Sequence, residues 1–271
     1  MIFISATIFA ILATLLCFFL DVSWYWLILI FIGSYPVFVI LFVITLYIIT
    51  LFHKMNKIVI KPKKFYGSMI YHVCVLLRWF LRVKVINEGF EKVKDLKGYA
   101  MVCNHQAIID PIVYIATSKE MDMSFIMKKE VRKIPLVGRW FNIAGLYYLD
   151  RGNPREGLKT ILNGVNALKA DRPVGVYVEG TRSKGGMLGE FHEGSFKMPQ
   201  KAKAPIAICI VDNTYMMAKN FPWKRTKVVI KVCEVLDYED YKDMTTKEIS
   251  DYVYNVMSKS LEEVRSKYKY N

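Results

Sequence analysis

The sequence predicts an α/β domain with a mixed, largely parallel sheet flanked by helices, preceded by an N-terminal hydrophobic helical hairpin. The chain has 271 residues, enough for one large domain and a membrane anchor. Residues 1–52 contain a single charged side chain, Asp21, whereas the remainder has the composition of an ordinary, basic soluble domain. In that remainder, short apolar runs alternate with amphipathic segments, which is typical of strands that alternate with helices.

The N-terminal segment contains two uncharged apolar runs, residues 2–20 and 24–51, joined by residues 21–23. About 20 apolar residues span a bilayer as a helix, so both runs are long enough. A cleaved signal peptide is disfavoured because no Lys or Arg precedes the first run. A spanning hairpin and a re-entrant pair confined to one leaflet both fit this pattern. Pro36 predicts a kink or break in the second run.

A basic cluster follows the second run and places the rest of the chain on the cytoplasmic side of the cell membrane. We therefore divide the chain into a membrane-anchoring segment, residues 1–64, and an α/β domain, residues 65–271. Residues 65–83 are apolar with two arginines, and they fit an interfacial helix or a core helix of the domain equally well. The cluster consists of His53, Lys54, Lys57, Lys61, Lys63 and Lys64.

The net charge of +14 favours a polyanionic partner. No RNP-like, zinc-finger or basic-zipper pattern supports nucleic acid, so the anionic leaflet of a membrane is the expected partner. The five cysteines are widely spaced and mostly lie in apolar runs, which predicts reduced thiols. No His, Cys or Asp cluster has metal-ligand spacing, and no glycine-rich nucleotide loop is present, so no metal or cofactor is expected.

The order of strands and helices directs attention to the residues that follow strands. Helices are expected to begin at Asp110-Pro111 and Asn153-Pro154, where a capping residue precedes proline, and near Thr245. In open α/β sheets, functional residues gather at the carboxyl ends of strands. The expected strands are residues 99–103, 124–128, 145–149, 174–178, 206–211 and 228–233.

His105 and Asp110 follow the first of these strands. A histidine with one ring nitrogen held by a carboxylate can take a proton on the other nitrogen. A five-residue spacing does not align two side chains on one helix face, so the pair requires His105 in a loop and Asp110 at the helix start. The alternative is that Asp110 only caps the helix, and it can serve both purposes.

Two further polar groups follow strands. Asp150 and Arg151 end the run at residues 145–149, and residues 179–183 (Glu-Gly-Thr-Arg-Ser) follow the run at residues 174–178. The planar guanidinium fork of arginine suits a phosphate, and Gly180 allows the backbone to approach a ligand closely. Taken alone, each group is also typical of a surface turn.

In this order, the motifs resemble those of the glycerolipid acyltransferase family. Its first motif, Asn-His-x-x-x-x-Asp, is matched by residues 104–110, and its Glu-Gly-Thr-Arg-Ser motif by residues 179–183. Residues 145–151 resemble its second motif, and Pro205 before an apolar strand resembles its fourth. Residues 127–138 are similar to its Lys-Glu-Leu and Ile-Pro-x-x-Gly segment. The resemblance covers about residues 75–235, with two departures, Ala107 and Val178.

The resemblance implies that His105 is the general base for a lipid hydroxyl and that Asp110 orients it. The hydroxyl attacks an acyl thioester directly, so no nucleophile, metal or cofactor is required of the protein. The expected donor is acyl-CoA or acyl-acyl carrier protein, and the expected acceptor is the sn-2 hydroxyl of 1-acyl-sn-glycerol 3-phosphate, giving phosphatidate. Implied substrate-binding residues are Lys128, Arg151 and Arg182 for phosphate, Glu179, Gly180 and Thr181 for pocket shape, and Pro205 for the acyl-donor side.

Three other activities remain compatible with the sequence. The acceptor could be glycerol 3-phosphate or another lysophospholipid. A thioester hydrolase would use His105 to activate water. A non-catalytic membrane lipid-binding protein would not need His105 and Asp110. The presence of both residues argues against this alternative.

Overall fold

A computed structural model describes residues 2–55, 57–117, 122–183, 186–268 and 270. The chain divides into two compact units, Met1–Met55 and Asn56–Asn271. Lysines 57–64 of the basic cluster therefore belong to the larger unit. The division after residue 64 separates an anchor from a domain by function, and it stays a prediction.

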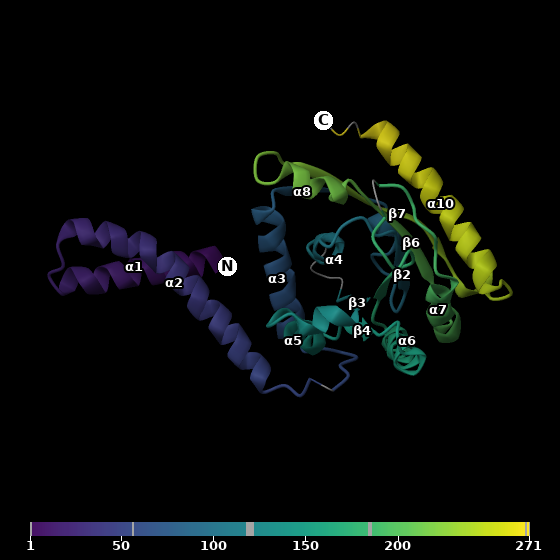
Figure 1. The fold of residues 1–271 in the computed structure, drawn as a ribbon, viewed down its shortest axis with the longest axis horizontal. Helices are drawn as coiled ribbons and strands as arrows, with labels where there is room; N and C mark the ends of the chain where they lie inside the picture. Colours follow the sequence, from purple (N-terminus) through teal and green to yellow (C-terminus); the bar gives the residue numbers. More distant parts are fainter. Residues whose placement is uncertain (1, 56, 118–121, 184–185, 269, 271) are drawn as a thin grey trace. The chain divides into compact units, whose positions relative to one another are not determined.

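The first unit is the predicted helical hairpin, α1 (Ile2–Phe19) and α2 (Trp24–Leu51) (Figure 1). The two helices touch through the rings of Phe9 and Phe38, whose centroids are 5.7 Å apart. Helix α2 continues through Pro36, so the predicted break does not occur. Within the described residues, α2 is long and apolar enough to cross a membrane, whereas the apolar part of α1 is shorter.

A seven-stranded sheet, counted over the described residues, forms the centre of the second unit in the order β1-β7-β6-β2-β5-β3-β4. Neighbouring strands are parallel except for β6 and β7. This confirms the predicted mixed, largely parallel sheet. Strand β1 was not among the expected strands. The strands are β1 (Val83–Glu88), β2 (Ala100–Cys103), β3 (Ser124–Lys128), β4 (Tyr147–Leu149), β5 (Val174–Tyr177), β6 (Ile206–Asp212) and β7 (Thr226–Leu236).

Helices cover both faces of this sheet (Figure 1). One face carries α3 (Lys64–Phe80), α4 (Asp110–Ile115) and α5 (Val137–Ile143). The other carries α6 (Pro154–Lys169), α7 (Lys197–Ala202) and α10 (Thr246–Lys267), and there Val253 and Met257 pack with Ile208 and Ile210. Shorter elements are α8 (Met217–Asn220), α9 (Tyr238–Tyr241), η1 (Phe90–Lys92), η2 (Lys129–Lys133), η3 (Glu193–Phe196) and η4 (Thr214–Met216).

The capping residues explain where two long helices begin. Asn153 accepts hydrogen bonds from the N–H groups of Arg155 and Glu156 at the start of α6, as the Asn-Pro pair predicts. Thr245 and Glu248 form a capping box at the start of α10. Both predicted helix starts are therefore confirmed.

Helix α3 reconciles the two interpretations of residues 65–83. Its Ile70 and Cys74 are buried in the domain, whereas Phe65, Trp79 and Phe80 are exposed. The run is thus an amphipathic helix packed on the domain, and it ends just before β1. An apolar run that continues from a helix into a strand hides the boundary, which is why β1 was missed.

The parallel strands bring the predicted polar groups to one edge of the sheet. Strands β2, β3, β4, β5 and β6 point the same way, so their carboxyl ends share that edge. The residues that follow these strands, including His105, Arg151 and Gly180, therefore emerge on the same side.

Candidate active site

The loop after β2 holds His105 and Asp110 together. Nδ1 of His105 lies 2.7 Å from Oδ2 of Asp110. Asp110 is fully buried, and the His105 side chain is 19% exposed. With Nδ1 donating to the carboxylate, the lone pair of Nε2 is left to take a proton from a substrate. This is the arrangement of a general base and its orienting group.

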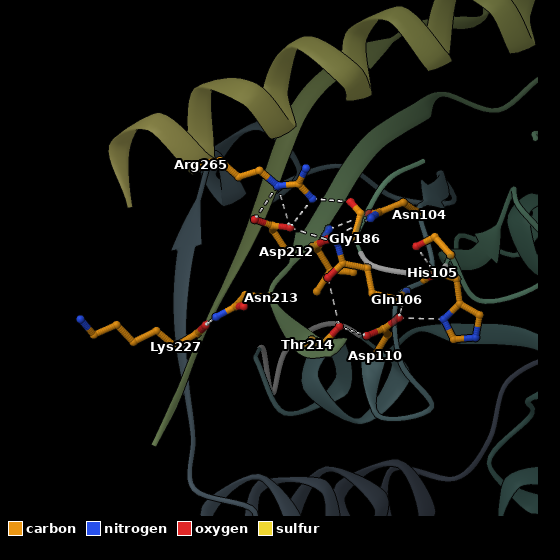
Figure 2. Close-up of polar contacts among 12 residues, drawn as sticks. Asn104, His105, Gln106, Asp110, Gly186, Asp212, Asn213, Thr214, Lys227 and Arg265 are labelled. Carbon is orange, nitrogen blue, oxygen red and sulfur yellow. Dashed lines mark hydrogen bonds and ion pairs between the residues drawn. The ribbon is translucent and has the colours of Figure 1, made fainter. Parts of the chain in front are cut away.

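Asp110 is fixed by three further hydrogen bonds (Figure 2). Oδ2 accepts from the N–H groups of Gln106 at 2.7 Å and Ala107 at 2.9 Å, and Oδ1 accepts from the Thr214 hydroxyl at 2.6 Å. The prediction that Asp110 is the helix N-cap is wrong, because α4 begins at Asp110 and the cap position is Ile109. The loop N–H groups draw the carboxylate back toward His105, so its charge has one fixed position.

Glu179 fastens the His105 loop to the segment that follows β5. Its Oε1 accepts from the His105 N–H and its Oε2 from the Gly189 N–H, both at 2.8 Å. Ser183 donates to the His105 carbonyl through its N–H at 2.7 Å and its hydroxyl at 3.0 Å. Burial raises the pKa of the Glu179 carboxyl above its ordinary value. Since backbone N–H groups occupy both carboxylate oxygens, Glu179 positions the His105 loop.

The His105 ring lies on an aromatic side chain. It stacks on Tyr177 of β5, with ring centroids 4.2 Å apart and planes 25° apart, and Tyr177 in turn stacks with Phe125 of β3 at 5.9 Å. Burial, and next the nearby Asp110 charge, raise the pKa of the Tyr177 hydroxyl well above its ordinary value. The stack therefore offers His105 an uncharged flat support.

Gly180 brings the ends of β4 and β5 together. Its backbone is left-handed, with φ 64°. A β-carbon at this position would lie 2.6 Å from Nη2 of Arg151 and 2.5 Å from Cδ2 of His192. Only glycine leaves room for these two side chains. The predicted residues Arg151 and Gly180 are thus neighbours, and His192 joins them.

Three other predicted substrate-binding residues, Lys128 and Arg182 for phosphate and Thr181 for pocket shape, are exposed. Thr181 and Arg182 lie on the surface of the turn after Gly180. Lys128 ends β3, beside the strand that leads to Arg151, and its Nζ lies 3.6 Å from a carboxylate oxygen of Glu130. These side chains are accessible to a ligand at the edge where His105 emerges.

Pro205 is the one predicted site residue that the structure separates from the others. It precedes β6, and its carbonyl accepts from the Ala100 N–H at the start of β2. Since β2 and β6 are parallel, Pro205 lies at the amino-terminal edge of the sheet, opposite His105. Its geometry supports strand pairing, and it lends no support to a role in binding the acyl donor.

The region of the chain that contains this site is similar to known proteins. Residues 82–212 match the family model described as acyltransferase, a region that contains His105, Arg151 and residues 179–183. We call residues 82–212 the acyltransferase domain, after the family model that they match. This domain includes both the strand-end loops and the strands β1–β6 that position them.

Two relatives of this chain carry the same name. The 1-acyl-sn-glycerol-3-phosphate acyltransferase of Saccharomyces cerevisiae is 29% identical over 199 residues, which cover 72% of this chain and 64% of the yeast protein. The protein of that name from Borreliella burgdorferi is 24% identical over 189 residues, covering 69% of this chain and 75% of that protein. This chain thus spans less than two thirds of the yeast relative.

A solved structure has the same fold as the acyltransferase domain. The crystal structure of the 1-acyl-sn-glycerophosphate acyltransferase PlsC from Thermotoga maritima superposes with a TM-score of 0.62 at 24% identity. The match covers 75% of this chain and 81% of that protein. At this level of identity the comparison establishes the fold.

A second polar network in the acyltransferase domain joins the catalytic loop to the C-terminal helix (Figure 2). Gln106 donates through Nε2 to Oδ1 of buried Asp212 at 3.0 Å. Asp212 pairs with Arg265 of α10 at 2.8 Å, and Arg265 also donates to the Gly186 carbonyl. The hydrogen bond with Asp212 raises the pKa of the Arg265 guanidinium above its ordinary value.

Sequence reasoning missed several of these positioning residues. Asp212 and Thr214 stand at the end of β6, so the strand-end rule that selected His105 also applied to them. For Arg265, which lies on the last helix, the sequence carries no such signal. Among the described residues, no group of three His, Cys, Asp or Glu side chains could hold a metal ion.

Proposed function

We propose that this chain is a 1-acylglycerol-3-phosphate O-acyltransferase. It would transfer a fatty acyl group from acyl-CoA or acyl-acyl carrier protein to the sn-2 hydroxyl of 1-acyl-sn-glycerol 3-phosphate, giving phosphatidate. The observation that carries the proposal is the His105–Asp110 pair, 2.7 Å apart at the sheet edge where Arg151 emerges. The name shared by the relatives supports the choice of acceptor.

His105 supplies the proton transfer in this reaction. The acceptor hydroxyl gives its proton to Nε2 of His105 as the oxygen attacks the thioester carbonyl. The new carbon–oxygen ester bond forms, the carbon–sulfur bond breaks, and the departing thiolate takes the proton back from His105. Asp110 offsets the positive charge on the imidazolium between these steps. The two substrates supply all reacting atoms, so the mechanism uses no metal or cofactor.

Cationic side chains at the same edge bind the acceptor phosphate. Arg151 and Arg182 each offer a planar pair of N–H donors that matches two phosphate oxygens. Lys128 adds a point charge, and the Thr181 hydroxyl adds a donor. Because Gly180 has no side chain, Arg151 can lie against the turn. These residues fix the acceptor so that its hydroxyl reaches His105.

The apolar helices and the basic cluster support a location of this chemistry at the membrane. Helix α2 is long and apolar enough to anchor the chain in a bilayer, and the lysines after it favour the cytoplasmic side. Both the acceptor and the product carry acyl chains. An enzyme held on the leaflet can therefore use its acceptor without extracting it into water.

The test is acyl transfer from a radiolabelled acyl thioester to lysophosphatidate in liposomes, with wild type, His105→Ala and His72→Ala. His72 lies on α3 and serves as the matched histidine control. We expect labelled phosphatidate from wild type and the control, and a fall of about 10²-fold or more in His105→Ala. Equal transfer by His105→Ala would exclude His105 as the base.

The same assay separates the rival activities. Release of fatty acid without lipid acylation would assign a hydrolase. Transfer to glycerol 3-phosphate or to another lysophospholipid, in place of lysophosphatidate, would change the acceptor and keep the catalytic pair. Binding of lysophosphatidate without any turnover would assign a lipid-binding protein.

A further inference from the structure

Aromatic side chains project from the domain where α3 ends and where the turn after α8 begins. Trp223 is 85% exposed and Phe80 is 59% exposed. The rings of Phe80 and Phe221 are 5.6 Å apart, which joins the two segments, and Figure 1 shows the turn after α8 beside the end of α3. We call residues 77–84 and 219–227 the aromatic–basic surface.

The aromatic–basic surface carries positive charge without compensating carboxylates. Its two segments contain seven basic residues and no Asp or Glu. The Thr226 N–H donates to the Arg82 carbonyl at 3.1 Å, and Lys84 and Lys227 are partners in the β1–β7 register, so residues 82–84 lie beside residues 226–227. No ion pair joins any of the seven to a described carboxylate. They are Arg78, Arg82, Lys84, Lys219, Lys224, Arg225 and Lys227.

We propose that the aromatic–basic surface docks the catalytic domain directly on an anionic lipid bilayer, as an attachment additional to the hydrophobic N-terminal hairpin. Tryptophan and phenylalanine beside Lys and Arg suit the membrane–water interface. The rings enter the headgroup region while the cations reach lipid phosphates. An acidic protein would satisfy the charges but would leave the protruding Trp223 without the apolar boundary that a bilayer provides. The combination therefore favours a membrane.

The docking segment is linked to the catalytic loop by a hydrogen bond. Thr214, whose hydroxyl holds Asp110 at 2.6 Å, begins η4, and the chain runs from there through α8 to Trp223. Docking through this turn would place the sheet edge that carries His105 near the leaflet that supplies the acceptor. The inference rests on surface composition and geometry, and docking itself requires no acyl transfer.

The first experiment locates residue 223 relative to the bilayer. A cysteine is introduced as Trp223→Cys in the full chain with Cys17→Ala and Cys233→Ser, since the other three cysteines are buried. An environment-sensitive fluorophore at this cysteine is tested in vesicles containing brominated phospholipids, with and without phosphatidylglycerol. We expect quenching at residue 223, severalfold stronger with the anionic lipid. The same label at Lys247→Cys, at the start of α10, should show no quenching.

The second experiment measures how much docking lowers the KM for lysophosphatidate. Lys224→Glu combined with Arg225→Glu should raise the KM for lysophosphatidate in anionic vesicles by about 30-fold, because each of the two basic side chains contributes about 1 kcal/mol near such a surface. The KM in mixed micelles should not change. The control, Lys201→Glu with Lys247→Glu, makes the same charge change on α7 and α10 and should leave both values unaltered.

Two outcomes would overturn the docking proposal. One is an unquenched label at residue 223 in vesicles that carry the chain on flotation. The other is a label that responds to an acidic carrier protein in a salt-dependent way but not to lipid, which would assign the surface to a protein partner. Quenching in a chain that transfers no acyl group would support docking and refute the proposed function, so the two can fail separately.

Discussion

The two sides of the candidate active site are built in opposite ways. Around Asp110 the polar groups are buried and bonded within the protein, and ties from Thr214 and Glu179 hold the catalytic loop to two other strand ends. The proposed phosphate-binding side consists of Arg151, Arg182 and other exposed side chains on turns. Proton transfer requires a base in one fixed position, whereas exposed cations stay hydrated until an anionic ligand replaces the water.

This contrast separates two kinds of mutational effect. Substitutions on the buried side should lower the rate of the chemical step, and some should also lower the free energy of unfolding, since they disturb satisfied buried groups. Substitutions on the exposed side should weaken acceptor binding with little effect on stability. A surface ion pair far from both sides should affect neither rate nor binding.

The largest effect is expected from Asp110→Asn. The amide oxygen can still accept from His105 and the loop N–H groups, and the Thr214 hydroxyl can rotate to accept from the new NH₂ group. The fold should therefore persist, but the charge that offsets the imidazolium is lost. We expect kcat to fall by about 10²-fold or more, with an unchanged KM for lysophosphatidate. A rise in KM without a fall in kcat, measured by steady-state kinetics, would show that the buried side governs acceptor binding and not the chemical step.

The next largest effect is expected from Gly180→Ala, which acts on the exposed side. The methyl group would overlap the positions of Arg151 and His192, and a left-handed alanine costs about 1 kcal/mol. Displacing Arg151 should lower kcat/KM for the acceptor by about tenfold. The control is Gly194→Ala, because a β-carbon there meets no atom within 4 Å. Similar kinetics for the two variants would show that Gly180 does not organise the phosphate-binding side.

The sequence predicted the parts of this architecture that rest on local pattern. Apolar runs revealed the hairpin and most strands, and the strand-end rule selected His105, Arg151 and Gly180. The role of Asp110 as a helix cap was predicted wrongly, because local capping competes with the N–H groups of its own loop, and only the folded loop decides the outcome. Strand β1 was hidden in an apolar run shared with α3.

Long-range contacts could not be predicted from the sequence. Arg265 meets Asp212 only because α10 packs across β6, and no spacing in the chain reveals that meeting. Pro205 stands in a motif, yet its position at the opposite sheet edge follows from strand direction, which a motif does not encode. On the exposed side, the sequence predicted which cationic residues are candidates for binding phosphate, because residue type alone identifies them.

A moderate effect is expected from Thr214→Val, which tests how strictly the buried side must be held. Valine keeps the shape of threonine but removes the donor to Oδ1 of Asp110. Leaving that buried oxygen unsatisfied should lower the free energy of unfolding by about 1–3 kcal/mol. We expect a severalfold fall in kcat, and Thr214→Ser should restore most of it because the hydroxyl returns. A purely structural role for Thr214 would lower stability in denaturant titrations and leave kcat unchanged.

The smallest effect is expected from Glu88→Gln, at a surface contact remote from the catalytic edge. Glu88 accepts from Lys267 and from the Tyr268 hydroxyl, and these hydrogen bonds, that from Lys267 first, lower the pKa of its carboxyl below the ordinary 4.5. A carboxyl with a lowered folded-state pKa stabilises the fold above pH 4.5, and this contribution is lost as the pH falls through the folded-state value.

The Glu88→Gln variant should therefore be less stable than wild type near neutral pH. The difference should be no more than about 1 kcal/mol, because solvent screens a surface pair. It should narrow as the solution is acidified below pH 4.5, while kcat and KM at neutral pH match those of wild type. Thermal unfolding across this pH range measures the difference directly. A loss of activity as large as that of Thr214→Val would mean that the surface contact and the buried network are coupled, and the contrast between them would not hold.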